Sequence, residues 1–257
     1  MMPSLIAVAL SVGVFFGMVA CFELGFRVGR SRAPIEPTAH EGIGMIGAAI
    51  LALLGLLLAF AFAGGMSRLD VRRELAVREA NVISNAYDLL DVLPPADKAE
   101  LRHLFRKYIG ARLRVYDVLP DIEAATAQNV IAAQLRGEIW KRAVAAGKLE
   151  PTGNATRLLL PALTELGDMA NARTVALKTH LPPLIFVLLI AVALLSGVVA
   201  GYAMGERKDR SVLHMLIYAA TVSITIYAVV DLDFPGFGLI QLETAEKILI
   251  DLHDSTR

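Results

Sequence analysis

Four long apolar stretches constrain this sequence more than any other feature. They cover residues 5–26, 43–65, 184–204 and 212–230. Each is long enough to cross the ~30 Å hydrocarbon core of a bilayer as a single helix. Short connections join them into two hairpins, over residues 1–65 and 181–231. The sequence therefore predicts a multi-pass membrane protein with four transmembrane helices.

A segment with helical patterning, residues 66–180, separates the two hairpins. The second apolar stretch continues without a proline to Leu93, so one long helix is expected to leave the bilayer and to end at Pro94 and Pro95. Further helices are predicted over residues 97–118, 121–146 and 155–179. The predicted fold is all-α, with a helical soluble domain inserted between spans two and three and a C-terminal tail over residues 232–257.

The composition narrows the classes of function. Hydrophobic residues make up 56% of the chain, and 25 Lys and Arg balance 25 Asp and Glu. This balance lacks the basic excess of nucleic-acid-binding proteins, so no nucleic-acid partner is expected. The single cysteine, Cys21, excludes an intramolecular disulfide. The sequence contains no nucleophile elbow, phosphate loop or zinc motif, and we predict neither an enzyme nor a bound metal or cofactor.

Glu23 and Arg27 are ionisable residues near the end of the first span. Charged groups at bilayer depth are costly and often mark permeation pathways, which makes both residues candidates for a pore. The two residues are also four positions apart, a spacing at which they can neutralise each other on one helix face. Both interpretations, permeation and a structural ion pair, remain open at this stage.

A short motif recurs at the ends of the first and third spans. Gly25-Phe26-Arg27-Val28-Gly29 parallels Gly201-Tyr202-Ala203-Met204-Gly205, and basic residues follow each motif. Glycines four residues apart allow the backbones of two helices to approach closely, so we predict that Gly25, Gly29, Gly201 and Gly205 pack helices together. The repetition is consistent with an ancestral duplication of the hairpin.

Further polar candidates follow spans two and four. Asp231 and Asp233 at the exit of span four would form an acidic ring at a pore mouth, or would cap the helix or pair with Arg68 or Arg73. Glu79 and Asn81, on the extension of span two, are further candidates for a pore or an ion-binding site. Asn81, Ser84 and Asn85 would line a vestibule, or would simply face water. The charged run from Arg68 to Glu79 is expected to be solvated and to contact neighbouring subunits, and Trp140 is expected in the core.

The charge of the loops bears on orientation. The short loops within the two hairpins hold three basic residues each, which by the positive-inside rule places them in the cytoplasm and the helical domain outside. Arg68, Arg72, Arg73 and Arg78, at the start of the domain, oppose this assignment. Because short loops weigh more in the rule, the loop charges favour an extracytoplasmic domain.

Three segments resemble one known family. They are residues Glu23 to Gly29, the run from Phe60 to Pro94, and Leu232-Asp233-Phe234-Pro235. Together with the order of the spans, they resemble the bestrophin-like domain family of bacterial membrane proteins. The resemblance implies a distant likeness to bestrophins, which are pentameric anion channels with four spans per subunit and a helical domain between spans two and three. In bestrophins that domain is cytosolic, contrary to the loop charges here.

Span count, domain placement and resemblance together lead to a functional hypothesis. We expect a homo-oligomeric ion channel or channel-like pore, a tetramer or pentamer whose partners are the lipid bilayer and ions. Four spans make a thin bundle, so a path for ions would lie on the axis of an oligomer rather than within one subunit. The alternative is a non-conducting membrane scaffold or sensor whose helical domain binds a partner protein.

Overall fold

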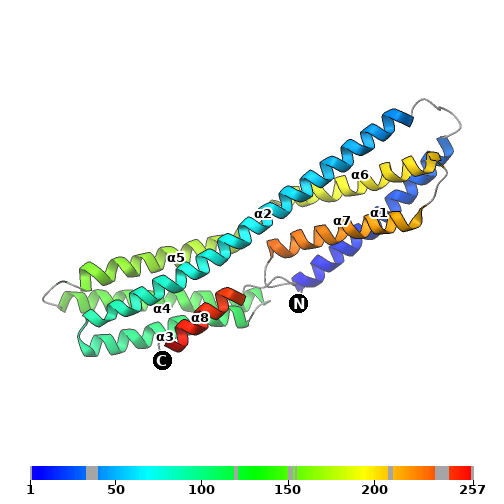
Figure 1. The fold of residues 1–257 in the computed structure, drawn as a ribbon. Coiled ribbons are helices and arrows are strands. Elements are labelled where there is room, and N and C mark those ends of the chain that lie inside the picture. The colour runs from blue at the N-terminus through cyan, green and yellow to red at the C-terminus, as the bar shows by residue number, and fades with distance from the viewer. Residues whose placement is uncertain are drawn as a thin grey trace. The chain divides into compact units, whose positions relative to one another are not determined.

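The computed structural model describes residues 2–32, 40–118, 121–149, 153, 155–207, 211–234 and 243–255, and in these residues every regular element is a helix. Figure 1 shows them. The helices are α1 (Met2–Arg32), α2 (His40–Asp88), α3 (Pro95–Asp117), α4 (Ile122–Leu149), α5 (Leu160–Lys178), α6 (Pro183–Arg207), α7 (Val212–Asp233) and α8 (Glu243–Ser255). A 3₁₀ turn, Leu89–Val92, extends α2, and a π-helical turn, Ala155–Leu159, precedes α5.

The predicted all-α membrane fold is confirmed. Four stretches are long and apolar enough to cross a membrane, and they lie within Leu5–Ser31, Met45–Val92, Arg157–Gly205 and Val212–Asp233. The long second helix is also present: α2 runs unbroken from His40 to Asp88, and the chain turns only at Leu93 before α3 begins at Pro95. Residues 33–39, 208–210 and the Pro235-Gly236 turn, which the loop-charge and turn arguments use, lie outside the described residues.

The chain forms two compact units. The membrane unit consists of residues 2–67 and 180–234, and the helical unit consists of residues 68–179 together with the C-terminal segment that contains α8. The helix α2 contributes to both. The sequence predicts the domain over residues 66–180 and a separate C-terminal tail over residues 232–257.

In the membrane unit, α1 packs against α6 and α7. The apolar core of this unit comes from all four membrane helices and includes Met18 of α1, Leu54 of α2, Ala193 of α6 and Ile226 of α7. Large apolar side chains on the other faces, such as Phe16, Phe60 and Leu184, are exposed. An apolar exterior of this kind matches a hydrocarbon solvent.

In the membrane unit, α1 and α6 approach each other closely at the glycines of the repeated motif. A Cβ added at Gly25 of α1 would overlap the carbonyl oxygen of Val198 of α6, and one added at Gly29 would overlap that of Tyr202. Reciprocally, a Cβ at Gly201 or Gly205 would overlap the carbonyl oxygens of α1 residues Phe22 and Phe26, respectively. The matched positions show that α1 and α6 run parallel at this contact. The two motifs therefore meet each other in an internally symmetric way.

The helical unit has its own apolar core. Ile83 of α2, Leu90 of the 3₁₀ turn that follows it, Phe105 of α3, Ile139 of α4 and Leu166 of α5 are fully buried in it. Leu249 of α8 is buried in the same core, and α8 contacts α3. The C-terminal segment is therefore part of the helical unit.

Candidate functional site

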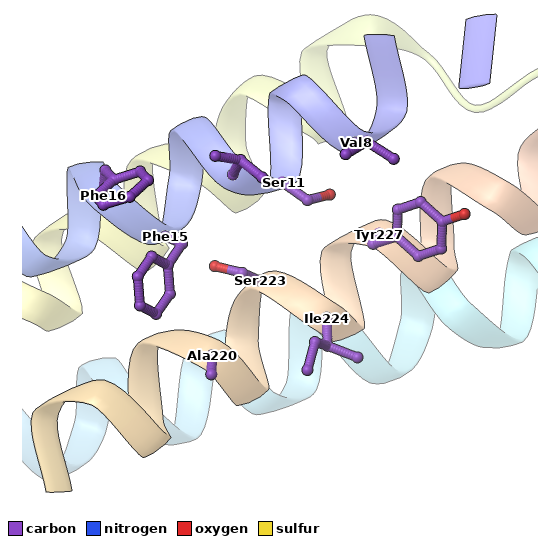
Figure 2. A pocket seen from close by; sticks show the side chains of 9 residues that line it. Val8, Ser11, Phe15, Phe16, Ala220, Ser223, Ile224 and Tyr227 are labelled. Carbon is purple, nitrogen blue, oxygen red and sulfur yellow. The ribbon is translucent and has the colours of Figure 1, made fainter. Parts of the chain in front are cut away.

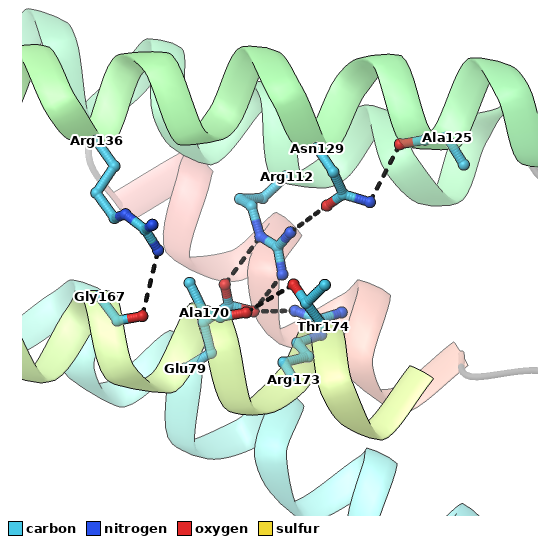
Figure 3. A network of polar contacts seen from close by, with 9 residues as sticks. All are labelled: Glu79, Arg112, Ala125, Asn129, Arg136, Gly167, Ala170, Arg173 and Thr174. Carbon is cyan, nitrogen blue, oxygen red and sulfur yellow. Dashed lines mark hydrogen bonds and ion pairs between the residues drawn. The ribbon is translucent and has the colours of Figure 1, made fainter. Parts of the chain in front are cut away.

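A buried ionic cluster lies at the centre of the helical unit (Figure 3). It joins Glu79 of α2, Arg112 of α3 and Arg173 of α5, and all three side chains are almost completely buried. Arg112 Nε lies 2.8 Å from Glu79 Oε1, and its Nη2 donates to Glu79 Oε2 at 2.9 Å. Arg173 Nη1 donates to the same Oε2. One carboxylate thus holds two guanidinium groups from two other helices.

Asn129 links a fourth helix, α4, to this cluster. Its side-chain oxygen accepts a hydrogen bond from Arg112 Nη1 at 2.6 Å, and its amide nitrogen donates to the carbonyl oxygen of Ala125 at 3.1 Å. Nearby, Arg136 of α4 donates to the carbonyl oxygen of Gly167 of α5 at 3.2 Å. Polar contacts therefore connect four helices of the unit at one level (Figure 3).

The cluster holds Glu79 in its ionised form. Burial on its own raises the pKa of this carboxyl, but the charges of Arg173 and Arg112 outweigh burial and bring the pKa below its ordinary value. Two arginines then face one carboxylate, so the three groups carry a net charge of about +1.

A small cavity with both polar and apolar walls adjoins the cluster. Its volume is about 60 Å³, and its lining includes Tyr108, Arg112, Asn129, Arg136, Asn171 and Thr174. The Tyr108 hydroxyl is buried and has no hydrogen-bond partner. Burial raises the pKa of Tyr108, and the charge of Glu79 raises it further, so the hydroxyl stays protonated at physiological pH. The cavity therefore offers proton donors and cationic groups.

Glu23 and Arg27 form the ion pair that their spacing allows. Arg27 Nε donates to Glu23 Oε1 at 2.9 Å on α1. The side chain of Arg27 is 76% exposed in the single chain and that of Glu23 is 28% exposed. The geometry matches the structural interpretation of the two residues, and the exposure of Arg27 leaves its other surface accessible to a neighbour or to water.

Asp233 ends α7 and holds the start of α6. Both of its carboxylate oxygens accept from the backbone N–H of Leu181 at 3.1 Å. His180 contacts the Asp233 carbonyl oxygen through Nδ1 at 3.1 Å, and its ring stacks on Phe234. Asp233 is fully buried and Asp231 is almost so. Asp233 therefore fixes the backbone of the segment that leads into α6, a contact that the sequence did not predict.

Asn81 lies on an exposed polar stripe of α2. The stripe comprises Glu74, Arg78, Asn81, Asn85 and Asp88, which are spaced four, three, four and three residues apart and are all exposed. Within it, Arg78 Nη2 donates to Glu74 Oε1 at 2.6 Å. A 3.5-residue repeat drifts around a straight helix by only about 20° per heptad, so the stripe stays on one side of α2 over residues 74–88.

The opposite face of α2 corrects one expectation. The charged run from Arg68 to Glu79 was expected to be solvated, but Arg72 and Glu79 are buried. Arg72 donates to the carbonyl oxygens of Ala176, at 3.1 Å, and Thr179, at 2.8 Å, at the C-terminal end of α5. A cation at this helix end is favourable because it faces the negative end of the helix dipole. Trp140, expected in the core, is 41% exposed.

An apolar cavity lies between α1 and α7 in the membrane unit (Figure 2). Its volume is about 310 Å³, and Val8, Phe15, Phe16, Ile224 and Tyr227 are among the residues that line it. Two serines also line it: Ser11 donates to the carbonyl oxygen of Ala7, whereas the buried Ser223 hydroxyl has no partner. The lining contains no charged residue, so this cavity suits an acyl chain better than an ion.

Sequence reasoning did not identify Arg112, Arg173, Asn129 or Tyr108. One signal in the sequence could have pointed to them. Arg72, Ala76, Glu79 and Ile83 share the face of α2 that packs inward, so Glu79 needed a cation from another helix. In the parts of the chain that the structure describes, no group of three or more His, Cys, Asp or Glu residues could hold a metal ion.

Comparison with known proteins identifies one family. The family model of the Bestrophin-like domain matches residues 12–246, which is most of the chain. No curated protein and no solved structure matches the chain significantly.

Proposed function

Because the chain belongs to the Bestrophin-like domain family, we propose that this membrane protein forms a homo-oligomeric ion channel or channel-like pore in a bacterial inner membrane. The observation that carries the proposal is the polar stripe of α2. It lies on the same continuous helix as the second span, so a pore lined by that span would continue into a polar passage.

The packing of the single subunit supports an axis shared between subunits. At the glycine contact, α1 and α6 approach so closely that even a methyl group would overlap the backbone. The cavity between α1 and α7 has no charged lining. Neither place has a charged lining, whereas α2 presents the polar stripe of residues 74–88 outward in the helical unit. Four or five copies around an axis would turn these outward stripes toward one another.

A second function has its own supporting observation. In the helical unit, a groove of about 450 Å³ between α4 and α5 is lined by Trp140, Leu163, Lys141 and Asp168 among others. Val130, Ile131 and Trp140 on α4 are exposed apolar side chains. A surface of this kind is suited to binding another protein, and it favours a non-conducting scaffold or sensor as the alternative.

Two measurements on the purified full-length protein test the proposal. The mass in mild detergent gives the number of subunits, which we expect to be four or five. Flux of K⁺, Na⁺ and Cl⁻ across liposomes then tests conduction. An oligomer with flux above that of empty liposomes supports the channel. A monomer, or an oligomer with no flux of any ion, would overturn it, and either result would leave the scaffold in place.

A further inference from the structure

The cavity between α1 and α7 contains a hydroxyl group that the surrounding side chains leave unsatisfied. Ser223 of α7 lines this cavity and is only 5% exposed. Its oxygen has no hydrogen-bond partner among the residues that the structure describes. Figure 2 shows this oxygen turned toward α1, across the space that the cavity occupies.

Other hydroxyl groups on the same two helices are satisfied by their own backbone. Ser11, Thr221 and Thr225 each donate to the carbonyl oxygen of the residue four positions earlier, at 2.9, 2.9 and 2.8 Å. Serine and threonine side chains in membrane helices commonly bond in this way, because lipid offers no partner. Ser223 differs from these three residues, so a hydrogen-bond acceptor is expected inside the cavity.

The cavity wall excludes charged occupants and disfavours water. The lining contains no charged side chain, so an ionised carboxylate or headgroup would lack a counter-charge at membrane depth. A buried water usually makes about three hydrogen bonds. Here Ser11 already donates its proton to Ala7, and Figure 2 shows the Tyr227 hydroxyl turned away from Ser223. The occupant of this cavity is therefore a neutral and mainly apolar molecule.

The size and shape of the cavity narrow the class further. Its volume of about 310 Å³ is roughly twice that of an apolar cavity known to hold a benzene ring. Phe15, Phe16 and Tyr227 contribute aromatic rings to the wall, and aromatic rings pack well against a planar ring. An acyl chain would match the apolar wall but would leave the Ser223 hydroxyl unsatisfied. A planar ring that carries an acceptor oxygen meets both requirements.

We propose that this cavity, bounded by Phe15, Phe16, Ser223 and Tyr227, binds a neutral, lipid-soluble carbonyl compound with a planar ring, the chemical class of the membrane quinones. A carbonyl oxygen of the ligand accepts a hydrogen bond from the Ser223 hydroxyl, and the ring packs against the phenylalanine side chains. Both helices of the site belong to the membrane unit of one subunit. Binding does not require ion conduction, so the site is independent of the proposed pore.

The test titrates the delipidated full-length protein, in mild detergent, with a decyl-substituted benzoquinone. Native mass spectrometry counts the quinone molecules that remain bound to each subunit, and the melting temperature is followed in parallel. We expect binding to saturate at one quinone per subunit. The melting temperature should rise with it, because a ligand that binds only the folded state stabilises that state.

Two kinds of variant locate the ligand in this cavity. Ser223→Ala removes the donor and should weaken quinone affinity by about three- to tenfold, the effect of one neutral hydrogen bond. Without quinone it should melt no lower than the parent, because the lost oxygen has no partner in the described part of the chain. Ala220→Phe fills the cavity and should abolish saturable binding, and Ala220→Leu makes the same test with a smaller side chain if phenylalanine prevents folding.

Thr221→Val is the matched control. It removes a hydroxyl group from the same helix, but Thr221 lies outside the cavity lining and donates to the carbonyl oxygen of Ile217. Its quinone affinity should equal that of the parent. Quinone that merely dissolves in detergent would be the same for all of these proteins.

The proposal is overturned if the parent takes up quinone without saturation, or if Ser223→Ala and the filled variants bind it as the parent does. It is also wrong if filling the cavity changes the number of subunits and leaves quinone binding intact, because the cavity would then receive a side chain of a second copy. Ion flux in liposomes does not enter these results, since binding is measured without a membrane gradient.

Discussion

Arg112 contacts both carboxylate oxygens of Glu79: its Nε lies 2.8 Å from Oε1, and its Nη2 donates to Oε2 at 2.9 Å. The two residues are 33 positions apart and lie on α3 and α2. Arg173, on α5, contacts the same carboxylate. Glu79 therefore joins three helices of the unit, and several measurable consequences depend on it.

Replacement of Glu79 should destabilise the helical unit strongly. Glu79→Gln leaves two buried guanidinium groups without their counter-charge, and we expect a loss of about 3–5 kcal/mol in the free energy of unfolding. Glu74→Gln is the matched control, because Glu74 pairs with Arg78 on the exposed stripe and should change stability by about 0–1 kcal/mol. Denaturant unfolding followed by circular dichroism measures both. Equal, small effects would show that the buried cluster does not stabilise the unit.

Glu79 should also make stability depend on acid pH. Its pKa in the folded state lies below the ordinary value of 4.5, so the unfolded state takes up its proton first as the pH falls. Glu79 then contributes fully to the free energy of unfolding above about pH 4.5, and this contribution is lost as the pH falls through the lower folded-state pKa. This is tested by measuring the melting temperatures of the parent and of Glu79→Gln between about pH 3 and 7, in steps of about half a pH unit. Parallel curves would contradict it.

Substitution at the glycine contact should separate α1 from α6. Gly25→Ala and Gly201→Ala each place a methyl group on a carbonyl oxygen of the partner helix, so the helices must move apart. We expect a destabilisation of about 1–3 kcal/mol for each, the range typical of overpacking. Gly13→Ala, also on α1, is the control because nothing lies within 4 Å of the added carbon. Thermal unfolding in mild detergent distinguishes them, and an equal response at Gly13 and Gly25 would refute the contact.

Asp233 should act through the start of α6 rather than through ion selectivity. Asp233→Asn keeps an acceptor for the Leu181 N–H, whereas Asp233→Leu removes it and should lower stability by about 1–3 kcal/mol. Since Asp233 is fully buried in the subunit, Asp233→Asn should leave the reversal potential under a salt gradient unchanged. If Asp233→Asn assembles normally but shifts the reversal potential, Asp233 would instead belong to an acidic ring at a pore mouth.

The sequence predicts the fold better than it predicts the buried site. Spans and helix ends follow from local signals: apolar length predicts the membrane helices, and Pro94-Pro95 predicts the end of the long helix that includes Glu79. The pairing of Glu79 with Arg173 depends on chain segments 94 residues apart, and nothing local specifies which arginine reaches it. The charged run was misread for the same reason, because charge alone does not tell which helix face a residue occupies.

The α2 stripe provides the most direct test of the proposed pore. With Cys21→Ser as a cysteine-free background, Asn81→Cys places a thiol on the stripe, and Gln134→Cys places one on an exposed position of α4 as the control. Both proteins are reconstituted in a bilayer, and a charged methanethiosulfonate reagent is added while the current is recorded. If α2 lines the pore, the reagent changes conductance and reversal potential in Asn81→Cys, with opposite effects for cationic and anionic reagents, and leaves Gln134→Cys unchanged. Current that does not respond to complete modification of Asn81→Cys would contradict a pore lined by α2.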